Sequence, residues 1–361
     1  MKDGAHARWE KQLRAFRAAA EAFRCASASR FMIWAPMLGR DAWRTISPED
    51  YRFAFERFGG SFAVHPRVVA LVATLAGRPV RYAGLTRKGE LLAAVPLWGD
   101  HILATKLALE FHGAEHLIDV GDSEVVLPVA ENVWVNIPFK ANMVSSLHAD
   151  TIVNVECESA FAMTLAKGVR IGDRRFSANS RSERRRETRR FQEVGGRFLP
   201  VKDFSAKETA AIYTRLFEKR WSFSPLGKHL LPTVLQEIRD MLGGEVLLVG
   251  DRPVAIELVY KSETPRWLLA NGVNRGVDPE FRNHSPGSIL LFRNIERFEE
   301  EASVKSKMLR FSFGLNDADY KGQWSFETPA YRLDPQQQKW SDLLSFDGLT
   351  AFLHKARGPS G

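Results

Sequence analysis

Nine arginines lie between Arg170 and Arg190, in the sequence RIGDRRFSANSRSERRRETRR. Only three acids, Asp173, Glu183 and Glu187, accompany them, which leaves an excess of six positive charges in a chain whose net charge is +8. A guanidinium group binds phosphate or carboxylate through two parallel hydrogen bonds. The segment therefore indicates a polyanionic partner: a nucleic acid, an anionic lipid surface or a phosphate-rich cofactor.

The pattern of this segment also predicts a helix. Ser180 followed by Glu183 fits a capping box, so the helix is expected to begin at Arg181 and to end before Gly195-Gly196. Glu183 and Glu187 can then pair with arginines three or four positions further on. Two interpretations stay open: a solvated helix that carries its own salt bridges, and a face that binds an anion or a membrane. The arginines of that face are Arg181, Arg184, Arg185, Arg186, Arg189 and Arg190.

Composition excludes several classes of protein. The chain has 361 residues, of which 45% are hydrophobic and 26% charged, so it can bury a sizeable core and is not intrinsically disordered. Its two cysteines, Cys25 and Cys157, are too few for a disulfide scaffold or a structural zinc site. His112 and His116 lack an HExxH context, and we expect no metal. The sequence also has no Walker loop, GxSxG elbow or dinucleotide fingerprint.

The sequence also bears on location. The first 14 residues are polar and charged, without the apolar core of a signal peptide. The nearest approach to a membrane helix, Val68 to Ala76, has 9 apolar residues and is too short to span a bilayer. We therefore expect a cytoplasmic protein, for which a peripheral position on a membrane surface stays open.

Apolar periodicity and turn signals predict alternating helices and strands. Hairpins beside a crossover helix imply an α+β fold with a mixed sheet, and the first half repeats the pattern more weakly. The predicted helices cover 8–26, a segment beginning at Ser47-Pro48, 65–75, 181–194, 205–221, 232–242, 285–302 and part of the tail from 334. The predicted strands cover 32–38, 80–85, 91–98, 124–129, 133–137, 197–201, 245–249, 254–260, 266–273 and 309–313.

Five pieces of the second half occur in an order that resembles one enzyme superfamily. They are the arginine helix with Gly195-Gly196 behind it, the helix end Leu216–Trp221, the hairpin with the turn Gly250-Asp251-Arg252-Pro253, the helix start Ser285–Ser288, and Phe311–Gly314 followed by Asp319-Tyr320-Lys321. This order is similar to the Fem-type and cellulose-biosynthesis-type branch of the GNAT acyltransferases, over roughly residues 170–330. Within that branch the chain most resembles the Mig-14 family.

The resemblance implies a GNAT-like mixed sheet flanked by helices, in two lobes that could be a degenerate tandem pair. We expect an N-terminal α+β lobe over residues 1–165, a GNAT-like acyltransferase lobe over 166–335 and a helical tail over 336–361. The family implies a Gram-negative bacterial virulence protein that confers resistance to cationic antimicrobial peptides and lies peripherally on the inner membrane. It also carries a label as a transcriptional activator.

The resemblance further implies where a donor binds. In a GNAT-type enzyme the donor's pyrophosphate is held by backbone N–H groups at a helix N-terminus. The corresponding segment here contains His284, Ser285, Gly287 and Ser288, with Arg282 able to supply charge. The alternative is a helix start that binds no ligand.

A GNAT-type transfer also needs groups that move protons. Glu257 lies mid-strand, on the face opposite Ile256 and Leu258, where burial would raise its pKa and suit it to accept the proton of an amine. The resemblance assigns Tyr320 to protonate the leaving group and Lys321 to contact a phosphate. The alternatives are an exposed, inert Glu257 and a packing tyrosine beside a surface lysine.

Three functions remain in comparison. The first is an acyl- or aminoacyltransferase at the cytoplasmic face of the inner membrane, with acyl-CoA or aminoacyl-tRNA as donor and a small molecule, a peptide or a lipid as acceptor. The second is a non-catalytic, membrane-associated resistance factor on the same scaffold. The third is a DNA-binding regulator, which only the arginine helix supports, because no helix-turn-helix pair of suitable spacing occurs. We favour the transferase.

Overall fold

The computed structural model describes residues 42–103, 105–170, 174–317 and 321–333. The predicted helix over 8–26, the strand over 32–38, the tail from residue 334 and the candidate residue Tyr320 lie outside these residues. The chain divides into two compact units, one of which comprises residues 43–86 and 90–334. The elements that concern the candidate site belong to that unit.

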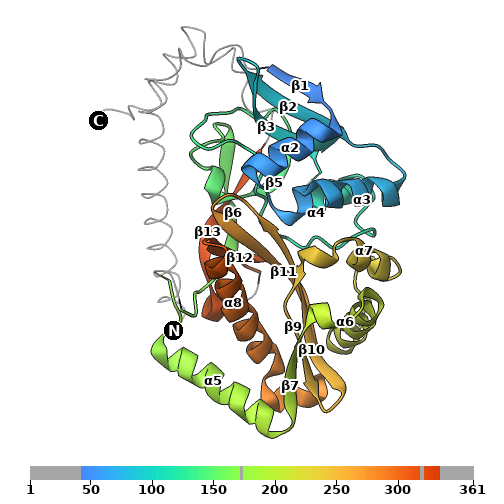
Figure 1. The fold of residues 1–361 in the computed structure, drawn as a ribbon, viewed down its shortest axis with the longest axis vertical. Helices are drawn as coiled ribbons and strands as arrows, with labels where there is room; N and C mark the ends of the chain where they lie inside the picture. Colours follow the sequence, from blue (N-terminus) through green and yellow to red (C-terminus); the bar gives the residue numbers. More distant parts are fainter. Residues whose placement is uncertain (1–41, 104, 171–173, 318–320, 334–361) are drawn as a thin grey trace, which may run out of the picture. The chain divides into compact units, whose positions relative to one another are not determined.

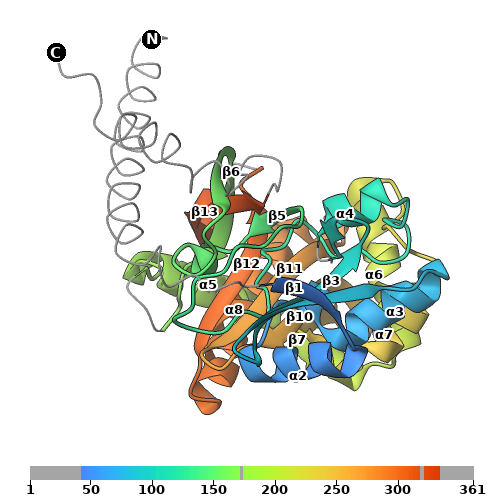
Figure 2. The ribbon, with the colours of Figure 1, turned by 90° about the horizontal axis from the view of Figure 1, so that it is seen from above.

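A small sheet and three helices form the first part of this unit. The strands follow in the order β1-β2-β3-β4. The local signals predicted α2 and α3 correctly: the Ser47 hydroxyl caps α2 in a capping box, and Gly77 ends α3 in the left-handed conformation with φ 60°. Figure 2 shows α2 alongside β3, against which it packs. The bounds are β1 Ala42–Ile46, α2 Pro48–Phe58, α3 Pro66–Ala76, β2 Arg81–Arg87, β3 Glu90–Trp98, β4 His101–Ile102 and α4 Lys106–Phe111.

A larger sheet carries the candidate site (Figure 1). Its strands follow in the order β5-β13-β6-β12-β11-β10-β9-β7, with the short β8 paired to β10. β11 and β12 are parallel, whereas the other recorded pairs are antiparallel, so the sheet is mixed as predicted. The bounds are β5 Ala141–Val144, β6 Val155–Ala166, β7 Gly196–Pro200, β8 Leu242–Gly243, β9 Glu245–Val249, β10 Arg252–Glu263, β11 Trp267–Val277, β12 Met308–Leu315 and β13 Ser325–Leu333.

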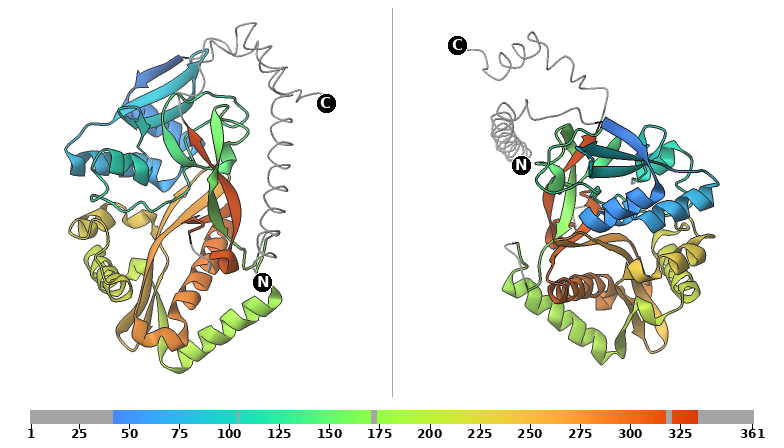
Figure 3. Two further views of the ribbon diagram at one scale, coloured as in Figure 1. Left: turned by 180° about the vertical axis from the view of Figure 1, so that it is seen from behind. Right: turned by 45° about the horizontal axis from the view of Figure 1, so that its top comes forward.

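Helices cover both faces of this sheet (Figure 3). α6 (Ala206–Trp221) and α7 (Leu231–Glu237) pack on one face, and α8 (Pro286–Val304) packs on the other. Alternation along β10 separates the two layers, because Ile256 and Leu258 join the core beneath α6 whereas Val259 joins the core beneath α8. α5 (Ala178–Glu193) lies against α8, and the short α9 (Lys321–Trp324) precedes β13. In the described part of the chain, no helix has the length and apolarity that crossing a bilayer requires.

The predicted start of the arginine helix was wrong by about one turn. The N-cap is Ser177, whose hydroxyl accepts a hydrogen bond from the backbone N–H of Ser180, so the helix already includes Ser180. Of the expected pairings of the two glutamates with later arginines, only an electrostatic effect of Arg190 on Glu187 is seen among the described residues. Both glutamates contact Arg184, at 3.1 Å from Glu183 and 2.7 Å from Glu187. Several serines in one short segment offer competing caps, and the serine that precedes the first turn prevails.

Other errors concern strands. Residues 124–129 and 133–137 form only isolated bridges, such as Val125 with Val144, although their apolar side chains are buried. The apolar pattern of these two segments therefore indicates burial and not pairing in a strand. The predicted helix over 232–242 is shorter: α7 ends at Glu237, and a 3-10 turn leads into β8. The prediction also omitted β5, β6 and β13. β5 and most of β6 lie before the expected domain boundary at residue 165, and both strands pair with β13 in the larger sheet. The division into lobes at residue 165 stays a prediction.

Candidate functional site

The two parallel strands β11 and β12 pair over only part of their length. The pairing joins residues 267–271 of β11 to residues 308–312 of β12. β11 continues to Val277 and stays paired with β10 along that stretch. Within the described residues the parallel strands therefore part beyond Asn271 and Ser312, and we call this point the fork. Ligands of α/β sheets bind at the carboxyl ends of parallel strands, which makes the fork the candidate site.

Glu257 lies beside the fork in a buried ion pair. Its side chain is 4% exposed. One carboxylate oxygen is 3.3 Å from Nε of Arg275, and the other accepts a hydrogen bond of 2.8 Å from the amide of Asn294. Burial raises the pKa of Glu257, although Arg275, the Asn294 hydrogen bond and Arg220 each act to lower it. A Cβ atom at Gly272 would stand 3.4 Å from the Glu257 carboxylate, so the carboxylate reaches the strand that leaves the fork.

Two partners of Glu257 connect it to α8. Asn294, on α8, also accepts a hydrogen bond of 3.1 Å from the backbone N–H of Glu245. Arg275, on β11, donates a hydrogen bond of 3.2 Å to the backbone carbonyl of Gly287, in the first turn of α8. The buried pair therefore fixes the first turn of α8 to the strands at the fork.

The residues predicted to hold a donor phosphate gather at this first turn of α8. Ser285 occupies the N-cap with φ 50°, and its hydroxyl makes no capping hydrogen bond. The backbone N–H groups of Ser288 and Ile289 donate to the Ser285 carbonyl, at 3.0 and 3.1 Å. Ser285, Gly287, Ser288 and His284 are half-buried, and Arg282 is exposed. No ion pair of Arg282 is recorded within the described residues.

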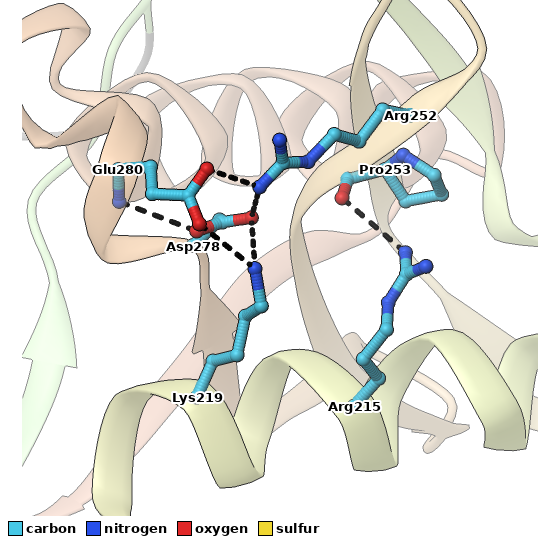
Figure 4. A network of polar contacts seen from close by, with 6 residues as sticks. All are labelled: Arg215, Lys219, Arg252, Pro253, Asp278 and Glu280. Carbon is cyan, nitrogen blue, oxygen red and sulfur yellow. Dashed lines mark hydrogen bonds and ion pairs between the residues drawn. The ribbon is translucent and has the colours of Figure 1, made fainter.

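A charged cluster holds the turn that leads into α8 (Figure 4). Asp278, buried at the end of β11, accepts hydrogen bonds from Lys219 on α6 at 2.9 Å and from Arg252 at 2.6 Å. Burial alone would raise the pKa of Asp278, but the hydrogen bonds from Lys219 and Arg252 outweigh it and lower the pKa. Glu280 contacts the same two cations at 3.4 and 2.6 Å. The segment that leads into α8 is therefore anchored to α6 and to the start of β10.

Lys321 takes a different set of partners from the predicted phosphate. Its ammonium group donates to the backbone carbonyls of Phe313 at 2.9 Å and Leu315 at 2.5 Å, and pairs with Asp317 at 2.7 Å. These contacts use the three N–H donors of the group and hold the end of β12. A phosphate contact of Lys321 stays a prediction.

The arginines of α5 fall into two groups. Arg181 donates to the Phe176 carbonyl, and Arg184 pairs with the two glutamates and stacks over the ring of Trp324 at 5.4 Å. The second group is exposed, and no ion pair is recorded for it within the described residues; it consists of Arg185, Arg186, Arg189 and Arg190. We call these four the outer arginines. Their binding to an anion or a membrane stays a prediction.

α5 also meets the start of α8. Glu187 shares a hydrogen bond with the Ser285 side chain, which lowers the glutamate pKa, while burial, the larger effect, raises it. The structure thus brings the arginine helix and the predicted donor-phosphate segment together, which sequence spacing did not indicate. As for metals, the described residues contain no group of three or more His, Cys, Asp or Glu side chains that could hold one.

Comparison with known proteins identifies the family. The model of the Mig-14 family matches residues 65–333. The chain belongs to the Mig-14 family. No curated protein sequence matches it.

Several solved structures are similar in fold to this Mig-14 family chain. FemX matches with a TM-score of 0.50 and 10% identity, over 82% of this chain and 98% of FemX. The L-PGS structure from Bacillus licheniformis matches with a TM-score of 0.44 and 11% identity, over 83% and 96%. A tandem GNAT protein from the clavulanic acid biosynthesis pathway matches with a TM-score of 0.35 and 10% identity, over 83% and 100%. The predicted fold class, a GNAT-like mixed sheet flanked by helices, is confirmed.

Sequence reasoning about this Mig-14 family chain missed the partners that organise the site. Arg275 pairs with Glu257 because the two residues are register partners on β10 and β11, and Asn294 donates to Glu257 from α8. No local motif signals either residue. Counting across the turn between the two strands would have placed Asn274 opposite Glu257, because a bulge between Leu258 and Val259 shifts the register by one residue.

Proposed function

We propose that this chain is an acyl- or aminoacyltransferase whose donor binds at the fork, with its phosphates against the first turn of α8. The observation that carries this proposal is the position of that turn. It follows β11 after the 3-10 segment Pro279–His284, lies against the part of β11 that continues beyond the fork, where Arg275 contacts the Gly287 carbonyl, and has a serine hydroxyl that is not used as a cap. A helix N-terminus attracts phosphate through its N–H groups and its dipole.

The charge nearby favours a donor that carries several phosphates. Glu187, on α5, contacts Ser285 at the start of α8. The helix that carries the outer arginines therefore lies next to the first turn of α8. Guanidinium groups bind phosphate bidentately. Acyl-CoA and aminoacyl-tRNA both present an acyl carbon together with phosphates, and both remain donors to be tested.

The transfer we propose is a nucleophilic acyl substitution. The nitrogen of an acceptor amine attacks the donor carbonyl, a C–N bond forms, and the C–S bond of a thioester or the C–O bond of an ester breaks. Glu257, directly or through water, accepts the proton that the amine loses. Tyr320 returns a proton to the leaving thiolate or alkoxide. Family membership and the FemX-like fold support this class of reaction.

We also propose a setting for this reaction. Membership of the Mig-14 family supports a role in bacterial resistance to cationic antimicrobial peptides. The acceptor we propose is a small molecule, a peptide or a lipid at the cytoplasmic face of the inner membrane, where the outer arginines contact anionic lipid. A non-catalytic resistance factor and a DNA-binding regulator are the alternatives that the first experiment separates from this proposal.

The first experiment is a thermal melt of the full chain with separate ligands: acetyl-CoA, longer acyl-CoAs, a charged tRNA pool, vesicles of anionic phospholipid, and duplex DNA. A ligand at 100 times its dissociation constant stabilises the protein by about 2.7 kcal/mol. Stabilisation by a thioester or by charged tRNA supports the transferase and names its donor. Stabilisation by vesicles or DNA alone contradicts it.

A glycine pair tests where the donor binds. A Cβ atom at Gly287 would make only an ordinary contact, 3.5 Å from Val277, so Gly287→Ala should fold normally. The added methyl group would stand at the backbone that a phosphate approaches, and we expect it to abolish the donor-induced shift. Gly322→Ala, where the methyl group meets nothing within 4 Å, is the matched control and should keep the shift. An undiminished shift in Gly287→Ala would place the donor elsewhere.

A further inference from the structure

Tyr213 has unused hydrogen-bonding capacity in the middle of the molecule. Its side chain is 2% exposed, on the face of α6 that packs against the sheet. Within the described residues its hydroxyl group has no hydrogen-bond partner. Buried polar groups in native proteins are almost always paired, and an exception calls for a reason beyond packing. The ring packs against Phe217, with the ring centres 5.6 Å apart, so a phenylalanine would fill the same space.

The negative charge of Asp119 acts on this hydroxyl. Burial raises the pKa of Tyr213 well above its usual value, and the negative charge of Asp119 raises it further. Asp119 has the same effect on the pKa of Tyr260, whose ring stacks on Phe62 at 4.2 Å. Asp119 itself is half-buried and accepts a hydrogen bond of 2.9 Å from the backbone N–H of Gly121. It is thus the more accessible end of a pair whose other end is Tyr213.

The turn that carries Asp119 lies across the fork. A Cβ atom at Gly121 would be 3.6 Å from the backbone of Val273, on β11 beyond the point where the strands part. A Cβ atom at Gly314, on β12 beyond that point, would be 3.1 Å from the backbone oxygen of Asp122. The turn over residues 119–123, which carries Asp119, therefore touches both strands beyond the point where they part.

We propose that Asp119 and Tyr213 bind the amino group of a substrate at the fork. This inference rests on the proposed transferase function and names the group that its amine-bearing substrate presents. A carboxylate accepts charge-assisted hydrogen bonds from an ammonium group, and the tyrosine hydroxyl accepts a further N–H. The aromatic side chains Phe62, Tyr213 and Tyr260 belong to one core cluster, and aromatic faces favour a cation.

The charged groups around the pair are compatible with a bound cation. Asp122, exposed on the same turn, and Glu257 add negative charge. Two cations also act on the pair, and both have contacts of their own. Lys106 lies 3.8 Å from Glu110, and Arg220 donates to the Arg275 carbonyl at 3.0 Å while it stacks over Trp221.

The first test compares two buried tyrosines by thermal melting of the full chain. If the Tyr213 hydroxyl is reserved for a ligand, Tyr213→Phe removes an unpaired polar group and raises the Tm, by about 2 °C. Tyr51→Phe is the matched control, because the Tyr51 hydroxyl is equally buried but donates to the Val64 carbonyl. That variant should lower the Tm. A Tyr213→Phe variant that loses stability as Tyr51→Phe does would overturn the proposal.

The second test measures the ligand preference by calorimetry, with n-pentylamine and n-pentanol as probes of equal length. The wild-type chain should bind the amine at least tenfold more tightly than the alcohol. Asp119→Asn and Tyr213→Phe should each reduce this preference, whereas Asp251→Asn, at an exposed position in the turn before β10, should retain it. An Asp119→Asn variant with the full preference, or a wild-type chain with none, would overturn the proposal. No acyl donor is present, so this result is independent of the donor melt.

Discussion

Each of the two faces of β10 and β11 covers a buried polar group, but only one of these groups has hydrogen-bonding partners in the described part of the chain. On the α8 face, Glu257 is paired with Arg275 and hydrogen-bonded to Asn294. On the α6 face, Tyr213 is equally buried, yet its hydroxyl has no partner within the described residues. Burial alone therefore does not show which group meets a substrate. The ion pair on the α8 face fixes the first turn of α8 to β11. In our proposal, the unpaired hydroxyl on the α6 face is the group that a substrate contacts.

The largest effect on stability should come from removing the ion pair between Glu257 and Arg275 on the α8 face. Arg275→Met leaves Glu257 buried without its cation, and removal of one partner from such a pair costs about 3–5 kcal/mol. Urea unfolding of the variant measures the loss. The double variant Glu257→Gln/Arg275→Met removes the uncompensated charge and should recover part of it. A loss below about 1 kcal/mol in the single variant would show that the ion pair does not hold this face together.

The pH dependence of stability should distinguish two buried carboxylates. The pKa of Glu257 is raised in the folded chain, so its contribution is fully present below the unfolded value of 4.5 and is lost as the pH rises through the folded pKa. The pKa of Asp278 is lowered, so its contribution is present above 3.8 and is lost as the pH falls through the folded pKa. A tenfold difference in proton affinity between the folded and unfolded chain corresponds to about 1.4 kcal/mol.

Urea midpoints measured from pH 3 to pH 8 test this contrast. Glu257→Gln should flatten the loss of stability above pH 4.5, and Asp278→Asn should flatten the loss at the acid end. If Glu257→Gln leaves the profile above pH 4.5 unchanged, the pKa of Glu257 is not raised by burial in the folded chain.

Helix caps extend the comparison to a smaller scale. Ser205 caps α6 in a capping box, in which its hydroxyl accepts a hydrogen bond of 3.2 Å from the backbone N–H of Glu208. Ser205→Ala should therefore cost about 1 kcal/mol of stability. Ser285 begins α8 without a capping hydrogen bond, so Ser285→Ala removes only the contact of its hydroxyl with Glu187 and should cost less than Ser205→Ala. Thermal or urea unfolding ranks the two variants. The reverse order would mean that the start of α8 is capped like any other helix and is not kept for a ligand.

The smallest effect on stability should come from the outer arginines. Replacement of Arg185, Arg186, Arg189 and Arg190 by glutamine should change the free energy of unfolding by no more than about 0.5 kcal/mol per residue, because these side chains are exposed and no close ion pair of theirs is recorded among the described residues. Binding to polyphosphate should weaken, and its salt dependence should become shallower. Arg184→Gln is the control: it breaks the contact with Glu187 and should destabilise the chain more. Unaltered polyphosphate binding would exclude these four residues as the anion-binding face.

Much of the fold could be predicted from local signals. Ser47-Pro48, His65-Pro66 with Gly77, and the turn at Gly250 each fix a helix or a hairpin within a few residues, and the structure has those elements. β6 and β13 escaped prediction because their pairing joins residues far apart in the sequence, such as Leu165 and Phe326. Long-range pairing leaves no periodic signal in a single segment.

The candidate site was predictable only in part, for a related reason. Glu257 and the Ser285–Ser288 segment show their chemistry locally, as a charge within an apolar strand and as a helix start. Asp119 and Tyr213 show none, because an aspartate in a turn and an aromatic residue on an amphipathic helix are ordinary. Only the tertiary structure brings the turn over residues 119–123 across β11 and β12.

The central claim is that the donor binds where β11 and β12 part, against the first turn of α8. Amide hydrogen exchange of the full chain, with and without the donor that most stabilises it in the melt, tests this claim most directly. The account predicts slower exchange at residues 271–276 and 287–290 when the donor is bound. Slower exchange confined to α5, with no change at the start of α8, would contradict it.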